Sequence, residues 1–494
     1  MESSFRRSAI PHVARIYAAA VLCAILAACA MPRSADGAEQ KAPLPATVSP
    51  GDRVLILAPH PDDETIACAG IIQKVVAAHV PLRIVFLTNG DDNELSFLVY
   101  RKHPVILGSS ALAMGALREK EAISACGILG VTRESLSFLG YPDYGTSAIW
   151  LSHWGSAKPY KSLLTHRTRV PYKSAYRFDA SYKGEDLLSD LTTIIRDYRP
   201  TKIFVSHPAD RNGDHWALYL FTKVALWNLS QEMRPDVYPY LVHFTKWPAK
   251  KGLYPKLPLE PPAELSGRMP WKESPLTSHE ETVKETALRA HRTQMSYSKK
   301  FLLSFVRTNE LFGEPPEILL AEKSELEVDG AGGGGGDEEE LTDEEKGSFV
   351  GLGKRLVELD SGKLILTVAL SRSLGRDVEV SVYIFGYRSD KDFGNMPKIH
   401  VRVGPFGHAI YDQRKKLPAT AFDVKREPKA IVISIPLETL GRPQKVITNA
   451  RTYLGEVPLD SGQWTSIDIK SAPPTINSTA PALESTAKTV GATR

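Results

Sequence analysis

The sequence predicts an α/β fold, with a Rossmann-like, mostly parallel sheet and flanking helices, followed by a C-terminal all-β domain of the sandwich type. Two apolar runs, residues 54–58 and 202–205, are each followed by a polar segment and a helical pattern, which is typical of strand–helix units. After a run of glycine and acidic residues at 329–346, short runs of alternating apolar residues replace this rhythm. The change of pattern predicts two domains of different class.

The amino terminus has the pattern of an export signal. Arg6, Arg7 and Arg15 precede an apolar stretch, residues 16–28, that is too short to span a membrane comfortably and is followed by Cys29. This pattern is similar to a bacterial lipoprotein signal, which implies cleavage before Cys29 and lipidation of its thiol. The protein would then be exported and lipid-anchored on the outer face of a bacterial membrane, either periplasmic or at the cell surface. The alternative is an ordinary secretory signal that is cleaved a few residues later.

Composition divides the chain into six segments. They are a signal peptide (1–28), a tether (29–47), a catalytic domain (48–328), a linker (329–346), a β-sandwich-like domain (347–470) and a disordered tail (471–494). The formal net charge of +4 falls to +2 without residues 1–28, because three Arg and one Glu leave, so nucleic acid is not an expected partner. Cys68 and Cys126 fall on expected helices, where we expect buried thiols and no disulfide.

The first polar segment combines metal ligands with a spare carboxylate. His60-Pro61-Asp62-Asp63-Glu64 lies between the apolar run 54–58 and an expected helix at 65–78, at the carboxyl end of a strand, where open α/β sheets place their sites. If the chain enters the helix near Asp62, His60 and Asp63 can converge on one point while Asp62 projects elsewhere. A catalytic zinc takes three protein ligands, so a further His must come from another part of the chain.

The second polar segment supplies a candidate for that ligand. Residues 206–215 follow the apolar run 202–205, precede a helical pattern and end in Asp214-His215. We expect His215 to be the third ligand and the adjacent Asp214 to fix its imidazole, either by a direct hydrogen bond or as a partner for its charged form. The alternative is that the acidic residues are ordinary first-turn residues and the histidines ordinary loop residues. Two such clusters, each at a strand-to-helix junction, favour the metal site.

These motifs resemble the PIG-L/LmbE-like family of zinc-dependent N-acetylglucosaminyl deacetylases, whose signature is the His-Pro-Asp-Asp-Glu segment with a later Asp-His. The resemblance extends over roughly residues 52–312 and includes four further segments: 87–91, 118–131, 138–143 and 304–312. It implies that Zn²⁺ is held by His60, Asp63 and His215, and that Asp62 is the general base. It also implies that Arg118 and Asp143 contact the substrate and that Asp214 orients the catalytic groups.

The chain departs from the family at Asn212, where many members carry a His that stabilises the oxyanion. An Asn amide can donate a hydrogen bond to a developing alkoxide, so Asn212 is a candidate for that role. His207 is an alternative donor or ligand, although a structural role at the strand end is as well supported. We expect Glu64 to hydrogen-bond the loop or a neighbouring residue.

The expected function is that of a zinc-dependent hydrolase that removes the acetyl group from an N-acetylated amino sugar in an envelope or extracellular glycan or glycoconjugate. One alternative is an amidase with the same mechanism that acts on another amide, such as a thiol conjugate. A second is a noncatalytic glycan-binding lipoprotein, against which the set of His60, Asp62, Asp63 and His215 argues. The sequence does not separate the first two.

Aromatic residues outside the motifs leave two questions open. In the β-domain, Tyr383, Tyr387, Phe393 and Phe406 either stack on a glycan or form core. The segment 147–182 is either a substrate rim or a self-packed loop; it contains Trp150, Trp154, Tyr160, Tyr172 and Tyr176. Because the linker follows the last motif, we expect a chain that ends near Glu327 to keep a core of its own and to fold.

Overall fold

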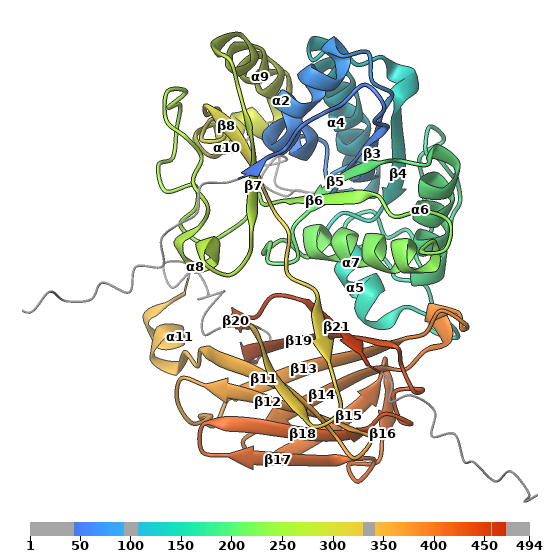
Figure 1. The fold of residues 1–494 in the computed structure, drawn as a ribbon, viewed down its shortest axis with the longest axis vertical. Helices are drawn as coiled ribbons and strands as arrows, with labels where there is room; N and C mark the ends of the chain where they lie inside the picture. Colours follow the sequence, from blue (N-terminus) through green and yellow to red (C-terminus); the bar gives the residue numbers. More distant parts are fainter. Residues whose placement is uncertain (1–43, 93–106, 330–340, 456, 471–494) are drawn as a thin grey trace, which may run out of the picture. The chain divides into compact units, whose positions relative to one another are not determined.

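The computed structural model describes residues 44–92, 107–329, 341–455 and 457–470, and its α/β part is built on a parallel sheet of five strands (Figure 1). The strand order is β4-β3-β2-β5-β6, and every neighbouring pair is parallel. The strands are β2 (Val54–Ala58), β3 (Leu82–Thr88), β4 (Leu136–Tyr141), β5 (Lys202–Ser206) and β6 (Asp236–Tyr240). The expected parallel sheet is confirmed.

Helices cover both faces of this sheet, which is why β2 is apolar at every position. Val54, Ile56 and Ala58 enter the core formed with α2, α4, α9 and α10, whereas Leu55 and Leu57 enter the core formed with α5, α6 and α7. The helices are α2 (Asp63–Ala77), α4 (Gly108–Ile128), α5 (Thr146–Ser152), α6 (Gly184–Tyr198), α7 (Gly213–Asn228), α8 (Ala263–Ser266), α9 (Ser278–Ala290) and α10 (Arg292–Leu303), with a 3-10 turn η1 (Arg133–Ser135).

The order of the strands places the site. The chain runs outward from β2 through β3 to β4, then returns to add β5 and β6 on the other side of β2. The carboxyl ends of β2 and β5 therefore lie side by side at the point where the order reverses, which is where open α/β sheets bind their ligands. The two polar segments of the sequence leave these two strand ends.

A small sheet adjoins the parallel one and contributes to the same side of the core. It has the order β1-β7-β8, with β1 parallel and β8 antiparallel to β7. Its strands are β1 (Leu44–Pro45), β7 (Trp271–Pro275) and β8 (Asn309–Gly313). Trp271, Leu311 and Phe312 from this sheet pack into the core that also holds α2.

The C-terminal region consists of two further sheets that share one core, as expected for a sandwich. In these sheets every pair is antiparallel except β9 with β21. The five-stranded sheet contains β10 (Ser324–Asp329), β11 (Leu352–Asp360), β12 (Lys363–Leu370), β18 (Ala430–Pro436) and β17 (Asp423–Glu427). The eight-stranded sheet contains β16 (Lys415–Leu417), β15 (Gly407–Asp412), β14 (Lys398–Gly404), β13 (Val378–Tyr387), β19 (Lys445–Leu454), β20 (Val457–Ser461), β21 (Thr465–Ile469) and β9 (Ile318–Leu320).

Strand β13 faces two different cores. Val380, Val382 and Ile384 enter the sandwich core, while the alternate residues Tyr383, Phe385 and Tyr387 enter the core that includes α5, α6 and α7. The 3-10 turn η2 (Phe393–Asn395) adds Phe393, whose ring stacks on Trp150 at 5.4 Å between centroids. Alternation along the strand thus gives one sheet two apolar faces, and the C-terminal region shares a core with the α/β region.

This shared core decides the role of five of the aromatic residues. Trp150 and Trp154 are fully buried against the C-terminal sheet and so form no substrate rim. Tyr383, Tyr387 and Phe393 are core residues and offer no stacking face to a glycan, whereas Phe406 is 91% exposed. A chain ending near Glu327 would keep the core on the α2 side of the sheet. It would leave the apolar surface around Trp150 uncovered, so its second core is not its own, contrary to the expectation.

The segment boundaries differ from the expected ones in two places. Strand β9 and all but the last residue of β10 fall within the expected catalytic segment 48–328, yet the two strands pair with β21 and β11 of the C-terminal sheets. The expected linker 329–346 includes the start of a helix, α11 (Asp343–Ser348), which Thr342 and Glu345 begin with a capping box. Acidic residues at a helix start and in a linker look alike in composition, so the sequence did not separate them.

Several expectations lie outside the described residues. These are the signal segment 1–28, Cys29, the tether up to residue 43, the glycine run of the linker and the tail 471–494. Among the helices that the structure describes, none combines the length and apolar character needed to cross a bilayer. Cys68 and Cys126 are buried and free, as expected.

Candidate active site

The two polar segments meet at one cavity at the carboxyl end of the parallel sheet. From the loop after β2 and the start of α2 come His60, Asp62 and Asp63, and Asn212 comes from the loop after β5. The other lining residues are Ile66, Arg118, Asp143, Tyr144, His243, Gln294, Tyr297, Ser298, Phe301 and Leu302. Six of the residues singled out from the sequence therefore line a single space.

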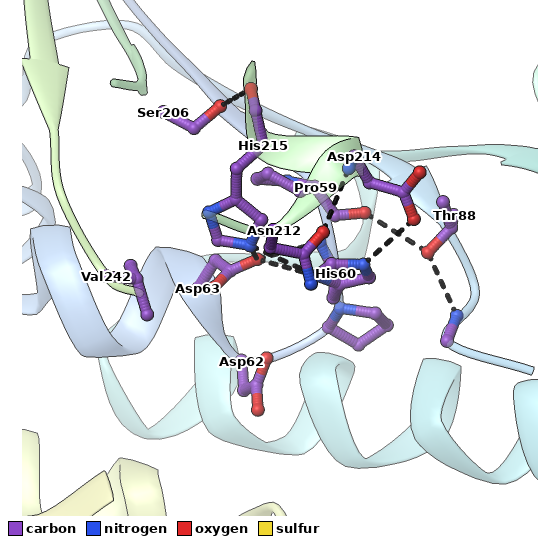
Figure 2. Close-up of polar contacts among 12 residues, drawn as sticks. Pro59, His60, Asp62, Asp63, Thr88, Ser206, Asn212, Asp214, His215 and Val242 are labelled. Atoms are coloured by element: carbon purple, nitrogen blue, oxygen red, sulfur yellow. Dashed lines mark hydrogen bonds and ion pairs between the residues drawn. The ribbon is translucent and has the colours of Figure 1, made fainter. Parts of the chain in front are cut away.

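Three donor atoms form a nearly equilateral triangle beside this cavity. Nδ1 of His60 lies 3.2 Å from Oδ2 of Asp63, Nε2 of His215 lies 3.2 Å from the same oxygen, and the two nitrogens are 3.3 Å apart (Figure 2). A zinc ion with bonds of about 2.0–2.1 Å to tetrahedral ligands separates its donor atoms by roughly 3.3 Å. The expected ligand set, with the spacing that a tetrahedral ion requires, is thus present in the fold.

The other ring nitrogens of the two histidines face carboxylates. Nε2 of His60 lies 3.2 Å from Oδ2 of Asp214 and 3.1 Å from Oδ1 of Asp143. Nδ1 of His215 lies 3.1 Å from Oδ2 of Asp210. Such outer carboxylates fix the ring tautomer and turn the remaining nitrogen toward a metal.

The orientation of His215 differs from the expectation that its sequence neighbour Asp214 holds it. Asp214 instead turns toward His60 and accepts hydrogen bonds from the backbone N–H of Tyr144 and Thr146. Successive residues at the start of a helix point in different directions, so Asp214 and His215 serve different partners. The carboxylate beside His215 belongs to Asp210, from the same loop.

The same donors offer a second, overlapping group. His60, Asp143 and Asp214 also have atoms close enough to hold an ion. Both groups use His60, through opposite ring nitrogens, and the second lacks a further imidazole. Two imidazoles and one carboxylate are a typical catalytic zinc set, so His60, Asp63 and His215 fit the metal better.

Asp62 lines the cavity without belonging to the donor triangle, and Figure 2 shows it apart from His60, Asp63 and His215. Its backbone has φ 144° and ψ −25°, a conformation that costs a non-glycine residue about 1–3 kcal/mol and is a mark of functional sites. Burial raises the pKa of Asp62 to about 7, a shift that Arg118 opposes and Asp63 reinforces. A carboxylate with such a pKa is suited to accept a proton near neutral pH.

Arg118 and Asp143, the expected substrate contacts, both line the cavity but also hold protein groups. Arg118 donates to the carbonyl oxygens of Gly90 and Pro61, and its Nη2 lies 3.6 Å from Oδ1 of Asp62. Asp143 lies beside His60 and accepts from the backbone N–H of Asp92. The geometry gives both residues a role in holding the site, and their contact with a substrate stays a prediction.

Asn212 begins α7 and faces the cavity. Its side-chain oxygen accepts a hydrogen bond from the backbone N–H of Asp214, at 2.9 Å, as a helix N-cap. The amide nitrogen is then the donor that remains on this side chain. This arrangement fits the expectation that Asn212 donates to the oxyanion.

The two remaining candidates from the sequence lie outside the donor triangle. His207 is fully buried, accepts from the backbone N–H of Ala209 and contacts the sulfur of Met269, and it does not line the cavity. Glu64 accepts from the backbone N–H of Asp62 and from the hydroxyl of Thr65. His207 is therefore structural, and Glu64 bonds the loop, as expected for it.

Several functional candidates were missed by reading the sequence. Asp210 lies inside the second polar segment, and Tyr144 directly follows Asp143. Their position next to residues of the motifs could have indicated both. His243 and the α10 residues Tyr297 and Phe301 belong to no motif. The fold alone brings them to the cavity.

Comparisons with known proteins match the same region. Residues 55–226 match the family model described as PIG-L: GlcNAc-PI de-N-acetylase. A probable N-acetyl-alpha-D-glucosaminyl L-malate deacetylase 2 from Bacillus anthracis is 38% identical over 90 residues, which are 18% of this chain and 36% of that protein. The chain thus spans about a third of that relative's length.

Solved structures with low similarity cover about half of the chain. One is the N,N'-diacetylchitobiose deacetylase from Pyrococcus horikoshii, 20% identical with a TM-score of 0.33, over 53% of this chain and 84% of that one. Another is a deacetylase of the teicoplanin biosynthesis pathway, 13% identical with a TM-score of 0.34, over 53% of this chain and 96% of that one.

Proposed function

Because residues 55–226 form a PIG-L family domain, as the sequence motifs indicated, we propose that the protein is a metal-dependent deacetylase that acts on an N-acetylated amino sugar of the N-acetylglucosamine type. One observation carries this proposal. A triangle of two imidazole nitrogens and one carboxylate oxygen lies beside a cavity that also presents a buried carboxylate outside the triangle, Asp62. Hydrolases that activate water with a metal ion use this combination of groups.

His60, Asp63 and His215 would hold the metal, and we propose Zn²⁺ because two imidazoles and a carboxylate in tetrahedral spacing suit it. The ion, when bound, acts as a Lewis acid and lowers the pKa of water. Asp214 and Asp210 keep the two imidazoles turned so that one nitrogen of each stays free of a proton.

Side chains of the protein carry out the proton transfer and stabilise the developing charge. Asp62 accepts a proton from the attacking water, and Arg118, beside it, keeps its carboxylate in place. The amide nitrogen of Asn212 donates to the carbonyl oxygen of the acetyl group as negative charge develops there. The proton held by Asp62 passes to the departing nitrogen, so acetate and a free amine leave.

We further propose that the enzyme is exported and lipid-anchored through Cys29, where it would meet envelope or extracellular glycans. The support is the sequence pattern before Cys29. Replacing Cys29 with Ala should release the protein from membranes and abolish metabolic labelling with a fatty acid. The anchor would be contradicted if the Cys29→Ala variant and the unaltered chain stayed on membranes to the same extent and the unaltered chain took up no labelled fatty acid.

The function is tested by acetate release. The zinc-loaded protein would be given monomeric and polymeric N-acetylhexosamine, with a non-acetyl amide, such as a thiol conjugate, as the competing substrate class. We expect acetate from an N-acetylated sugar, loss of activity on chelation and recovery with zinc. Faster cleavage of the non-acetyl amide would show that the protein is an amidase of the same mechanism and not a deacetylase.

A further inference from the structure

The backbone of Asp62 is held by a side chain two residues further along. The N–H of Asp62 donates to Oε2 of Glu64 at 3.0 Å, within the turn that enters α2. Asp62 is the N-cap of α2 and its own carboxylate makes no capping hydrogen bond, so the side chain stays free for the cavity. An N-cap residue usually has an extended backbone with negative φ, whereas Asp62 has φ 144°.

Glu64 is in turn fixed by a residue far away in the sequence. Its Oε1 accepts from the hydroxyl of Thr65 at 2.6 Å and lies 3.4 Å from Nε2 of His291. His291 is 1% exposed and sits at the junction of α9 and α10. The contact therefore links the turn at Asp62 to the start of α10, the helix that supplies one wall of the cavity.

We propose that Glu64 is a positioning residue for Asp62, and that His291 fixes Glu64 for this purpose; the role in catalysis rests on the proposed function. The hydrogen bond from the Asp62 N–H to Glu64 stabilises a backbone conformation that an aspartate does not favour by itself. Without this acceptor the turn relaxes toward an ordinary N-cap conformation. The change in φ swings the Asp62 carboxylate away from its place in the cavity beside Arg118.

The nature of the side chain matters for this role. An ionised Glu offers acceptors only, so one oxygen serves the Asp62 N–H while the other meets Thr65 and His291. A Gln keeps an acceptor oxygen that can serve the Asp62 N–H, and a Met of similar length keeps none. The pair of variants thus separates the hydrogen bond from the volume of the side chain.

The test is a double-mutant comparison with Asp62. We expect Glu64→Met to lower kcat by about 10²-fold, the scale of a small misplacement of a catalytic group, with KM little changed and the metal retained. Glu64→Gln should keep most of the activity, and Glu134→Met, at an exposed glutamate, should change nothing. In the Asp62→Asn background, Glu64→Met should cause no further loss, because it acts through the residue already removed.

Two measurements in solution would overturn the proposal. One is an equal fold-loss from Glu64→Met in both backgrounds, and the other is loss of the metal from the variant. Should Glu64→Met not fold, His291→Phe removes the far partner and is expected to show the same dependence on Asp62, with a smaller loss of kcat. A crystal structure of the variant tests the position of Asp62 without an activity assay. We expect φ of Asp62 to leave its positive value. An unchanged φ would refute the positioning role even if the unaltered protein proved to have no deacetylase activity.

Discussion

Oδ2 of Asp210 lies 3.1 Å from Nδ1 of His215 and also accepts hydrogen bonds from the backbone N–H of Val242 and His243. One buried carboxylate thus joins the loop after β5 to the loop after β6 and lies beside the imidazole of His215, which we propose as a metal ligand. We predict that Asp210→Asn weakens metal affinity by about 10–100-fold, the usual effect of losing such a partner. Metal titration against a chelator would measure it, with the exposed Asp236→Asn as the control. Unchanged affinity would mean that the two loops hold His215 without Asp210.

The free carboxylate and the ligand carboxylate should respond differently to the same change. Asp62→Asn should lower kcat by about 10²–10⁴-fold, because it removes the proton acceptor, while metal content stays the same. Asp63→Asn should weaken metal binding as well, because it replaces the anionic donor of the three by a neutral amide oxygen. Metal analysis beside turnover numbers separates the two outcomes. Full turnover in Asp62→Asn would assign the base to another residue.

Asn212 has two functions that one pair of variants separates. Asn212→Ala should lose both the helix cap, at about 0.5–2 kcal/mol of stability, and the donor to the oxyanion. Asn212→Asp keeps an acceptor for the N–H of Asp214 but has no amide to donate, so kcat should fall by about 10²–10³-fold while Tm stays close to that of the unaltered chain. An active Asn212→Asp enzyme would rule out the donor role, and its metal content serves as the control.

Phe393 and Phe406 test the shared core with matched aromatic residues. Phe393 is 1% exposed and stacks on Trp150, whereas Phe406 is 91% exposed. Phe393→Ala should reduce the free energy of unfolding by about 3–5 kcal/mol. Phe406→Ala should change it by less than about 0.5 kcal/mol. Denaturant unfolding would show the difference. A similarly small effect of Phe393→Ala would mean that the shared core contributes little to the stability of the protein.

Lys398 should make stability depend on pH in the alkaline range. Its ammonium is buried and donates to the backbone carbonyls of Phe393 and Met396, and burial lowers the pKa of Lys398 from 10.5 to about 7. The unfolded chain therefore holds a proton that the folded chain releases, so the free energy of unfolding should rise as the pH increases from about 7 toward 10.5. Lys398→Met should remove this rise. The free energy of unfolding would be measured with urea near both ends of this pH range, for the unaltered chain and for Lys398→Met. An equal change with pH in both proteins would show that Lys398 stays charged in the fold.

The sequence by itself determined the class of each region and pointed to the residues that we propose for the metal site. Its apolar runs 54–58 and 202–205 are buried strands, since a strand covered on both faces must be apolar throughout. Each run leads directly into a polar segment, so His60, Asp63 and His215 were readable as ligands from their place at strand ends. Each of these signals comes from residues that are close together in the sequence.

Only the tertiary structure decided which groups support that site and where the cores lie. Asp210 rather than Asp214 faces His215, because the direction of each side chain depends on how the loop closes before α7. Glu64 meets His291 across 227 positions of the chain, a contact that no local pattern records. The aromatic residues of β13 and of α5 form one core because a strand presents alternate residues to opposite faces, and only packing shows that both faces of β13 are covered.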